Sequence, residues 1–154
     1  MKNAAGIIAS IALLTILVTG LVAVQPAQGQ ELETRLYVGL WTEHYIHDDP
    51  DYNESNDIVQ LSAYTEDNWF VSAATFSNSH YDDSTLVGIG REYHAEYLDG
   101  FSWGIMLAAV HGYEGKIQTH YKGLLFAPIS YYKYKNLKAI VVGPVVNIGL
   151  EFEF

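Results

Sequence analysis

Histidine and aspartate side chains gather in two polar segments of the chain, residues 46–56 and 78–84. Carboxylate oxygens are the ligands that Ca²⁺ and Mg²⁺ prefer, so these segments could hold a divalent ion that bridges lipid phosphates. The candidate ligands are His47, Asp48, Asp49, Asp51, His80, Asp82 and Asp83. Their spacing matches no defined metal motif, and a solvated acidic rim accounts for them more simply. We therefore predict no metal site and no cofactor.

The elements that must position these segments are β-strands. The clearest pattern ends the chain, where apolar residues at 146, 148, 150, 152 and 154 alternate with polar or small ones. A period of two is that of a strand with one apolar face. Turn-forming residues and polar clusters divide the rest of the chain in the same way. The sequence predicts eight strands, at about 34–45, 57–65, 69–77, 85–95, 101–112, 120–132, 137–143 and 145–154.

The first 29 residues have the pattern of a secretory signal. Lys2 precedes an apolar run over residues 6–24, and small residues stand three and one before a cut after Gly29. A run of this length also suits an uncleaved membrane anchor, which is the alternative. We predict a cleaved signal peptide over residues 1–29 and one domain over residues 30–154.

Composition excludes several classes of protein. Of the 154 residues 49% are hydrophobic, 12 are Tyr and only 17% are charged, which argues against a disordered chain. The net charge of −10 would repel a phosphate backbone, so we predict no nucleic-acid partner. The absence of cysteine excludes disulfides and thiolate metal sites.

The lengths of the connections indicate a membrane barrel. Three longer connections (46–56, 78–84 and 113–119) fall on one rim, and three tight turns (66–68, about 99–100 and 135–136) on the other. Outer-membrane barrels have long loops outside and short turns in the periplasm. Aromatic residues near strand ends could form interfacial girdles: Tyr37, Trp41, Trp69, Tyr93, Tyr131 and Tyr132. We predict an all-β, eight-stranded, antiparallel up-and-down transmembrane barrel of the outer membrane.

The fifth predicted strand separates a lipid face from a lumen face. Trp103, Ile105 and Leu107 lie on its large apolar face, and Gly104 and Met106 on the other. Small inward residues suit an eight-stranded barrel, whose interior holds packed side chains or one slim ligand. If the lumen holds an acyl chain, its lining includes Met106, and the inward glycines Gly88 and Gly104 are candidates for its floor.

Residues 122–130 and 137–143 carry apolar residues on both faces. Part of the lumen is therefore apolar, either as a packed interior or as a cavity for a hydrocarbon chain. Pro128 has no N–H to donate to a neighbouring strand. It implies an unpaired neighbour, a bulge or a lateral opening through which a lipid chain could enter.

An ordered set of short motifs resembles one family. The set is Trp41-Thr-Glu-His-Tyr45, Asp51-Tyr-Asn-Glu54, Asn68-Trp69, Phe76-Ser-Asn-Ser-His-Tyr81 and Gly88-Ile-Gly90, followed by Leu124-Leu125, Pro128 and the terminal Phe154. In order and approximate spacing it resembles the outer-membrane lipid A palmitoyltransferases, over most of residues 30–154. The chain departs from the family in having few residues before the first strand, where the family has an amphipathic helix.

The resemblance implies three catalytic positions. His44 matches the family's histidine and Ser79 its serine, whereas Asn78 stands where the family has aspartate. Acyl transfer needs a base, a hydroxyl and oxyanion donors; an amide can donate and accept hydrogen bonds but cannot act as a base. Asp82 and Asp83 are nearby substitutes for the missing carboxylate. A regular first strand would point His44 outward, so a β-bulge is needed to turn it inward.

Two functions remain open at this point. The resemblance implies an acyltransferase that moves a phospholipid acyl chain to lipid A at the outer rim, as a monomer whose only partners are membrane lipids, in a Gram-negative outer membrane. The alternative is a non-catalytic barrel with a structural, surface-shielding or adhesion role, which the Asn at position 78 favours.

Overall fold

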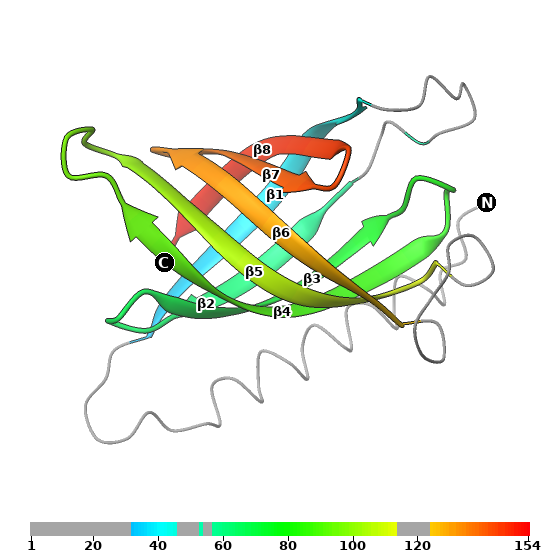
Figure 1. Ribbon diagram of the computed structural model, residues 1–154, viewed down its shortest axis with the longest axis horizontal. Helices are drawn as coiled ribbons and strands as arrows, with labels where there is room; N and C mark the ends of the chain where they lie inside the picture. The colour runs from blue at the N-terminus through cyan, green and yellow to red at the C-terminus, as the bar shows by residue number, and fades with distance from the viewer. Residues whose placement is uncertain (1–31, 46–52, 54–56, 114–123) are drawn as a thin grey trace.

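The computed structural model describes residues 32–45, 53, 57–113 and 124–154 and is built from strands (Figure 1). The eight strands are β1 (Glu33–His44), β2 (Val59–Tyr64), β3 (Trp69–Ser77), β4 (Asp83–His94), β5 (Phe101–His111), β6 (Leu124–Tyr134), β7 (Leu137–Val142) and β8 (Val145–Glu153). Each agrees with a predicted segment to within a few residues. The predicted signal peptide lies outside the described residues, and among those that are described no helix is long and apolar enough to cross a membrane.

The strands form a closed up-and-down barrel. Each pairs antiparallel with its neighbours in the chain, and β8 pairs with β1 to complete the ring. The predicted all-β, eight-stranded antiparallel barrel is therefore confirmed. Because consecutive strands alternate in direction, the β2–β3, β4–β5 and β6–β7 turns lie at one end, with the end of β8 (Figure 1). The loop that carries Asn78 and Ser79 lies at the other end, which we call the loop end.

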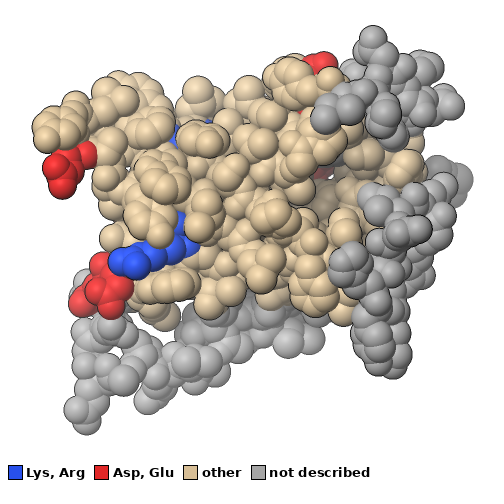
Figure 2. All heavy atoms as spheres, in the orientation of Figure 1, with Lys and Arg blue, Asp and Glu red and all other residues tan. Residues whose placement is uncertain are grey.

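Side chains alternate between the lumen and the outer wall as the sequence predicts. In β5, Trp103, Ile105 and Leu107 are exposed on the outside, whereas Gly104 and Met106 face inward. The face of the barrel shown in Figure 2 carries few charged side chains, and most of these lie toward the two ends of the barrel.

Two aromatic residues expected in the outer girdles instead face the lumen. Tyr37 is 1% exposed and Tyr131 is 3% exposed. The period of two explains both positions, because Tyr37 shares its face with Arg35 and Tyr131 shares its face with Ile129. Both correspondingly contact other lumen side chains: Tyr37 bonds the amide of Asn147, and Tyr131 bonds Glu92.

A β-bulge in β1 reverses the facing of the residues that follow it. Gly39 pairs with Gly149 of β8 and Trp41 with Ile148, so Leu40 is an extra residue without a partner in β8. Leu40 and Trp41 both point outward, at 68% and 47% exposure. From Thr42 onward the even-numbered residues face the lumen. The bulge that the sequence required is present, and it turns His44 inward.

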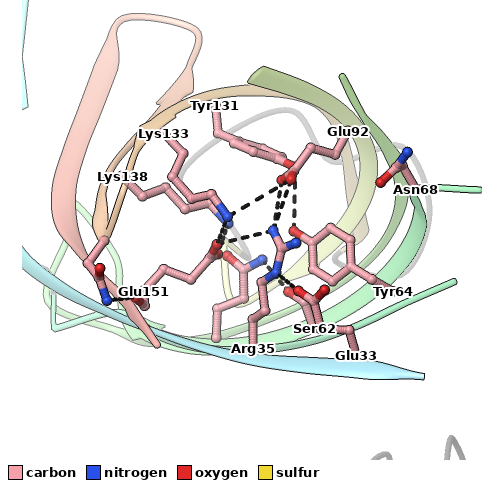
Figure 3. A network of polar contacts seen from close by, with 12 residues as sticks. Glu33, Arg35, Ser62, Tyr64, Asn68, Glu92, Tyr131, Lys133, Lys138 and Glu151 are labelled. Atoms are coloured by element: carbon pink, nitrogen blue, oxygen red, sulfur yellow. Dashed lines mark hydrogen bonds and ion pairs between the residues drawn. The ribbon is translucent and has the colours of Figure 1, made fainter. Parts of the chain in front are cut away.

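The lower half of the lumen, toward the tight turns, holds a buried ionic cluster. We define it as Arg35, Glu92, Lys133, Lys138 and Glu151, whose side chains converge from facing walls (Figure 3). The Arg35 guanidinium donates to both Glu92 oxygens at 3.0 Å and lies 4.0 Å from the ring centre of Tyr64.

The other carboxylate of the cluster, Glu151, is paired with cations in the same way. Glu151 pairs with Lys138 and, at 3.1 Å, with Lys133, and the Tyr131 hydroxyl donates to Glu92 at 2.5 Å. Such close pairing offsets the cost of removing these charges from water. The cluster plugs this end of the barrel.

Candidate functional site

The bulge in β1 and the loop after β3 bring His44 and Ser79 together. His44 Nε2 lies 2.7 Å from Ser79 Oγ, which is a short hydrogen bond. β1 ends at His44 and β3 ends two residues before Ser79, so both residues sit where strands give way to loops at the loop end. A histidine that bonds a serine hydroxyl can take its proton. The structure thus joins two of the three predicted catalytic residues.

The third predicted residue, Asn78, uses its side chain to hold the loop. Its Oδ1 accepts hydrogen bonds from the backbone N–H groups of His80, at 2.8 Å, and Asp82, at 3.1 Å. Its Nδ2 donates to the Gly112 carbonyl at 2.7 Å and to Ser84 Oγ at 3.0 Å. Asn78 is fully buried. These contacts make it a positioning residue for the loop that carries Ser79.

The nearby acidic residues do not fill the role of a buried carboxylate. Asp82 and Asp83 are both exposed, and Asp82 meets Asn78 through its backbone. Of the candidate cation ligands, His47, Asp48, Asp49 and Asp51 lie outside the described residues. Within the described ranges no group of three or more His, Cys, Asp or Glu side chains is arranged to hold a metal ion.

Asn53 anchors the serine from the loop after β1. Its backbone N–H donates to the Ser79 carbonyl at 2.9 Å. Its side-chain amide donates to Ser77 Oγ at 3.0 Å and to the Asn78 carbonyl at 3.1 Å. Asn53 belongs to the Tyr-Asn-Glu motif of the resemblance, which gave it no stated role.

Tyr113 is a site residue that the sequence did not indicate. It lies two residues beyond the end of β5, it lines the same cavity as Ser79, and its ring meets the His80 ring edge-on with the ring centres 6.4 Å apart. Burial raises the pKa of Tyr113 above its ordinary value. Its position in a predicted loop, with no recognisable spacing to Ser79, left no signal in the sequence.

The half of the lumen toward the loop end is a cavity of about 540 Å³, and His44, Ser79 and Tyr113 line it. Most of the remaining lining is apolar: Ile58, Ala74, Phe76, Leu86, Met106, Val110, Leu125, Ala127, Ile129, Ile140 and Val142. Of the two interpretations of the apolar lumen, the structure favours a cavity. Its apolar lining suits a hydrocarbon chain whose polar end lies at the histidine and serine.

Met106 is one of the residues that line this cavity. A Cβ atom at Gly88 would lie 2.6 Å from Met106 Sδ, so Gly88 leaves the space that the methionine occupies. Gly104 has the same relationship to the Tyr131 ring. Both glycines face the lumen, as expected, but Met106 forms the lining while the glycines accommodate the side chains opposite.

Pro128 stands beside a gap in the barrel wall. The pairing of β6 with β7 begins only at Ser130, so residues 124–129 have no partner in β7. The cavity reaches outward here, because its lining includes the outward-facing Phe126 and Pro128 and the β7–β8 turn at Gly143 and Pro144. Of the three explanations for Pro128, this geometry fits the unpaired neighbour and the lateral opening.

Comparison with known proteins adds no family to this description. No protein-family model matches the chain, and no curated protein sequence matches it.

Proposed function

We propose that this protein is an outer-membrane acyltransferase of the lipid A palmitoyltransferase kind. One observation carries the proposal: the hydrogen-bonded pair His44 and Ser79 lies at the polar end of an apolar cavity inside a barrel. An eight-stranded barrel with an apolar wall and longer loops at one end fits the outer membrane of a Gram-negative cell. The loop end would then face outward.

The cavity would hold one acyl chain of a phospholipid donor. The chain enters sideways through the gap beside Pro128, because entry from the loop end would draw the hydrocarbon through water. Its ester group then rests beside His44 and Ser79. The ionic cluster closes the other end and limits how far the chain can descend.

The reaction exchanges one ester for another. His44 removes a proton from the attacking hydroxyl and later returns it to the leaving lysophospholipid oxygen. The acyl carbon ends on a hydroxyl of lipid A, so no cofactor is consumed. Asn78 keeps the Ser79 loop in place through its four hydrogen bonds.

The test is mass spectrometry of lipid A from Gram-negative cells that lack a palmitoyltransferase of their own and express this chain. We expect a new acyl-sized mass that disappears in the His44→Ala and Ser79→Ala variants. His94→Ala is the matched control, since His94 is exposed at the opposite end of the barrel. No new mass from a folded barrel would overturn the proposal and favour the non-catalytic role.

A further inference from the structure

A groove of about 700 Å³ crosses the outer wall of the barrel. A continuous row of paired residues follows it over five neighbouring strands, from β3 to β7: Trp69, Arg91, Ile105, Ser130 and Val141. Trp69 begins β3 beside a tight turn, whereas Val141 lies one residue before the end of β7, at the loop end. Because the strands are tilted, the groove rises obliquely from one end of the barrel to the other (Figure 1).

The bed of this groove is apolar. Ile89, Ile105 and Leu107 line it, and each is more than half exposed. Leu107 pairs with Pro128, so the groove runs beside the gap between β6 and β7. Aliphatic side chains on the outside of a membrane barrel contact lipid chains. A hydrocarbon chain is therefore the matching occupant of this part of the groove.

Arg91 places a cation in the groove near the end with the tight turns. Its guanidinium carbon lies 5.7 Å from the ring centre of Trp69 and 5.6 Å from that of Tyr93. None of the ion pairs of the described residues involves Arg91. Tyr93 in turn stacks on Trp103, with ring centres 4.5 Å apart. Tyrosine and tryptophan gather at the level of the lipid headgroups in a membrane barrel, so the cation lies at that level too.

We propose that this groove binds one anionic glycerophospholipid of the phosphatidylglycerol kind, with its phosphate on Arg91 and an acyl chain along Ile89 and Leu107. The inference takes from the proposed function only the orientation in the membrane: with the loop end outward, Arg91 reaches the leaflet that faces the periplasm. Charge complementarity selects the headgroup. A guanidinium binds phosphate through paired hydrogen bonds, and a zwitterionic headgroup would bring a second cation beside it.

This lipid differs from the acyl donor in the position of its headgroup. The ester of the donor must reach His44 and Ser79 at the loop end, whereas Arg91 lies toward the opposite end. The groove and the inner cavity share Met106, Pro128, Ile129 and Gly143 in their linings. A chain that rises along the groove from Arg91 therefore approaches the outside of the gap beside Pro128. The outer wall thus carries a second lipid site.

The test measures lipid binding to the purified barrel in detergent by native mass spectrometry. Phosphatidylglycerol and phosphatidylcholine are each titrated, and the molecules that stay bound after removal of the micelle are counted. We expect one phosphatidylglycerol per barrel, bound more tightly than phosphatidylcholine. Arg91→Gln should weaken this binding by roughly 10-fold or more, because a charge-assisted hydrogen bond is lost.

Lys135→Gln is the matched control and should bind as the wild type does. Lys135 is also a cation at the end with the tight turns, and its Nζ lies 5.5 Å from the ring centre of Tyr134, but it does not line the groove. The heat-dependent mobility of each variant on a denaturing gel reports whether its barrel has folded. Equal binding by Arg91→Gln and the wild type, or equal binding of the two lipids, would overturn the proposal.

A phosphatidylglycerol with a diazirine in one acyl chain locates the bound molecule. After irradiation we expect cross-links to outward-facing residues of β4 and β5, Ile89 and Leu107 among them. Cross-links confined to lumen residues would overturn the site on the outer wall. Binding is measured without lipid A and without turnover, so failure here leaves the proposed acyl transfer standing. Absence of acyl transfer would likewise leave this lipid site standing.

Discussion

The side chain of Asn78 donates a hydrogen bond to the carbonyl oxygen of Gly112 at 2.7 Å. This bond ties the loop that carries Ser79 to the residue before Tyr113. The same amide group donates to Ser84 and accepts from two backbone N–H groups, so both its donor and its acceptor sides are in use. A carboxylate has no N–H to donate, and its oxygen would face the Gly112 carbonyl. Asparagine at this position is therefore a structural requirement of this chain.

The first prediction concerns Asn78→Asp, which restores the residue that the palmitoyltransferase resemblance leads one to expect. We expect it to lower acyl transfer and to reduce the free energy of unfolding by about 1–3 kcal/mol, because buried partners lose their donor. Urea unfolding, followed by tryptophan fluorescence, measures the stability, and lipid A mass spectrometry measures the transfer. Asn136→Asp, at the tight-turn end, is the control. Higher activity in Asn78→Asp would show that a carboxylate is needed here.

The second prediction concerns the bulge at Leu40. Deleting Leu40 joins Gly39 directly to Trp41, and residues 41–44 keep their partners in β8, so His44 still faces the lumen. Deleting Glu43 shortens the chain equally but moves His44 to an outward position. We expect transfer to survive the first deletion and to fall to the level of His44→Ala in the second. Equal loss in both folded variants would contradict the role of the bulge.

Features that depend on neighbouring residues could be predicted from the sequence, whereas features that depend on pairing between distant strands could not. The alternation in β5 depends on neighbouring residues, so its inward and outward faces were predicted correctly. Residue type and nearness to strand ends place Tyr37 and Tyr131 in the outer girdles, and this prediction is wrong for both. The period-two alternation of their strands puts them on the lumen side, where the structure has them. The sequence showed that His44 needed a bulge, but placing it at Leu40 required the pairing with β8.

The contacts at the site were beyond sequence reasoning for a different reason. Asn78 and Gly112 are 34 residues apart and meet only when β4 and β5 pair. The same pairing brings Tyr113 and Ser79 to one cavity. Nothing in the spacing of either pair signals this proximity, because the intervening strand lengths and register decide it. The resemblance supplied His44 and Ser79, and the structure adds the residues that hold them.

The third prediction concerns the length of the acyl chain. Met106 lines the cavity and occupies space left by Gly88. Met106→Ala should open that space and admit longer chains, whereas Gly88→Ala should push the flexible methionine upward and select shorter ones. Mass spectrometry of the product, with phospholipids of mixed chain length as donors, gives the length directly. Shifts in the same direction in both variants would place the limit of the cavity elsewhere.

The fourth prediction concerns the ionic cluster. Glu92 is 1% exposed and accepts two hydrogen bonds from Arg35 Nη1, so Glu92→Gln removes one of the carboxylates that pair with this buried cation. Removing one partner of a buried pair costs about 3–5 kcal/mol. We expect a loss of this order in the free energy of unfolding, measured by urea titration in detergent. Glu96→Gln, in the exposed β4–β5 turn, is the control.

Acyl transfer by the folded fraction of Glu92→Gln should be unchanged, because the ionic cluster contributes no residue to the lining of the cavity. A stability equal to that of the control would mean that the two other carboxylates beside Arg35, Glu33 and, at 3.6 Å, Glu151, compensate the cation without Glu92.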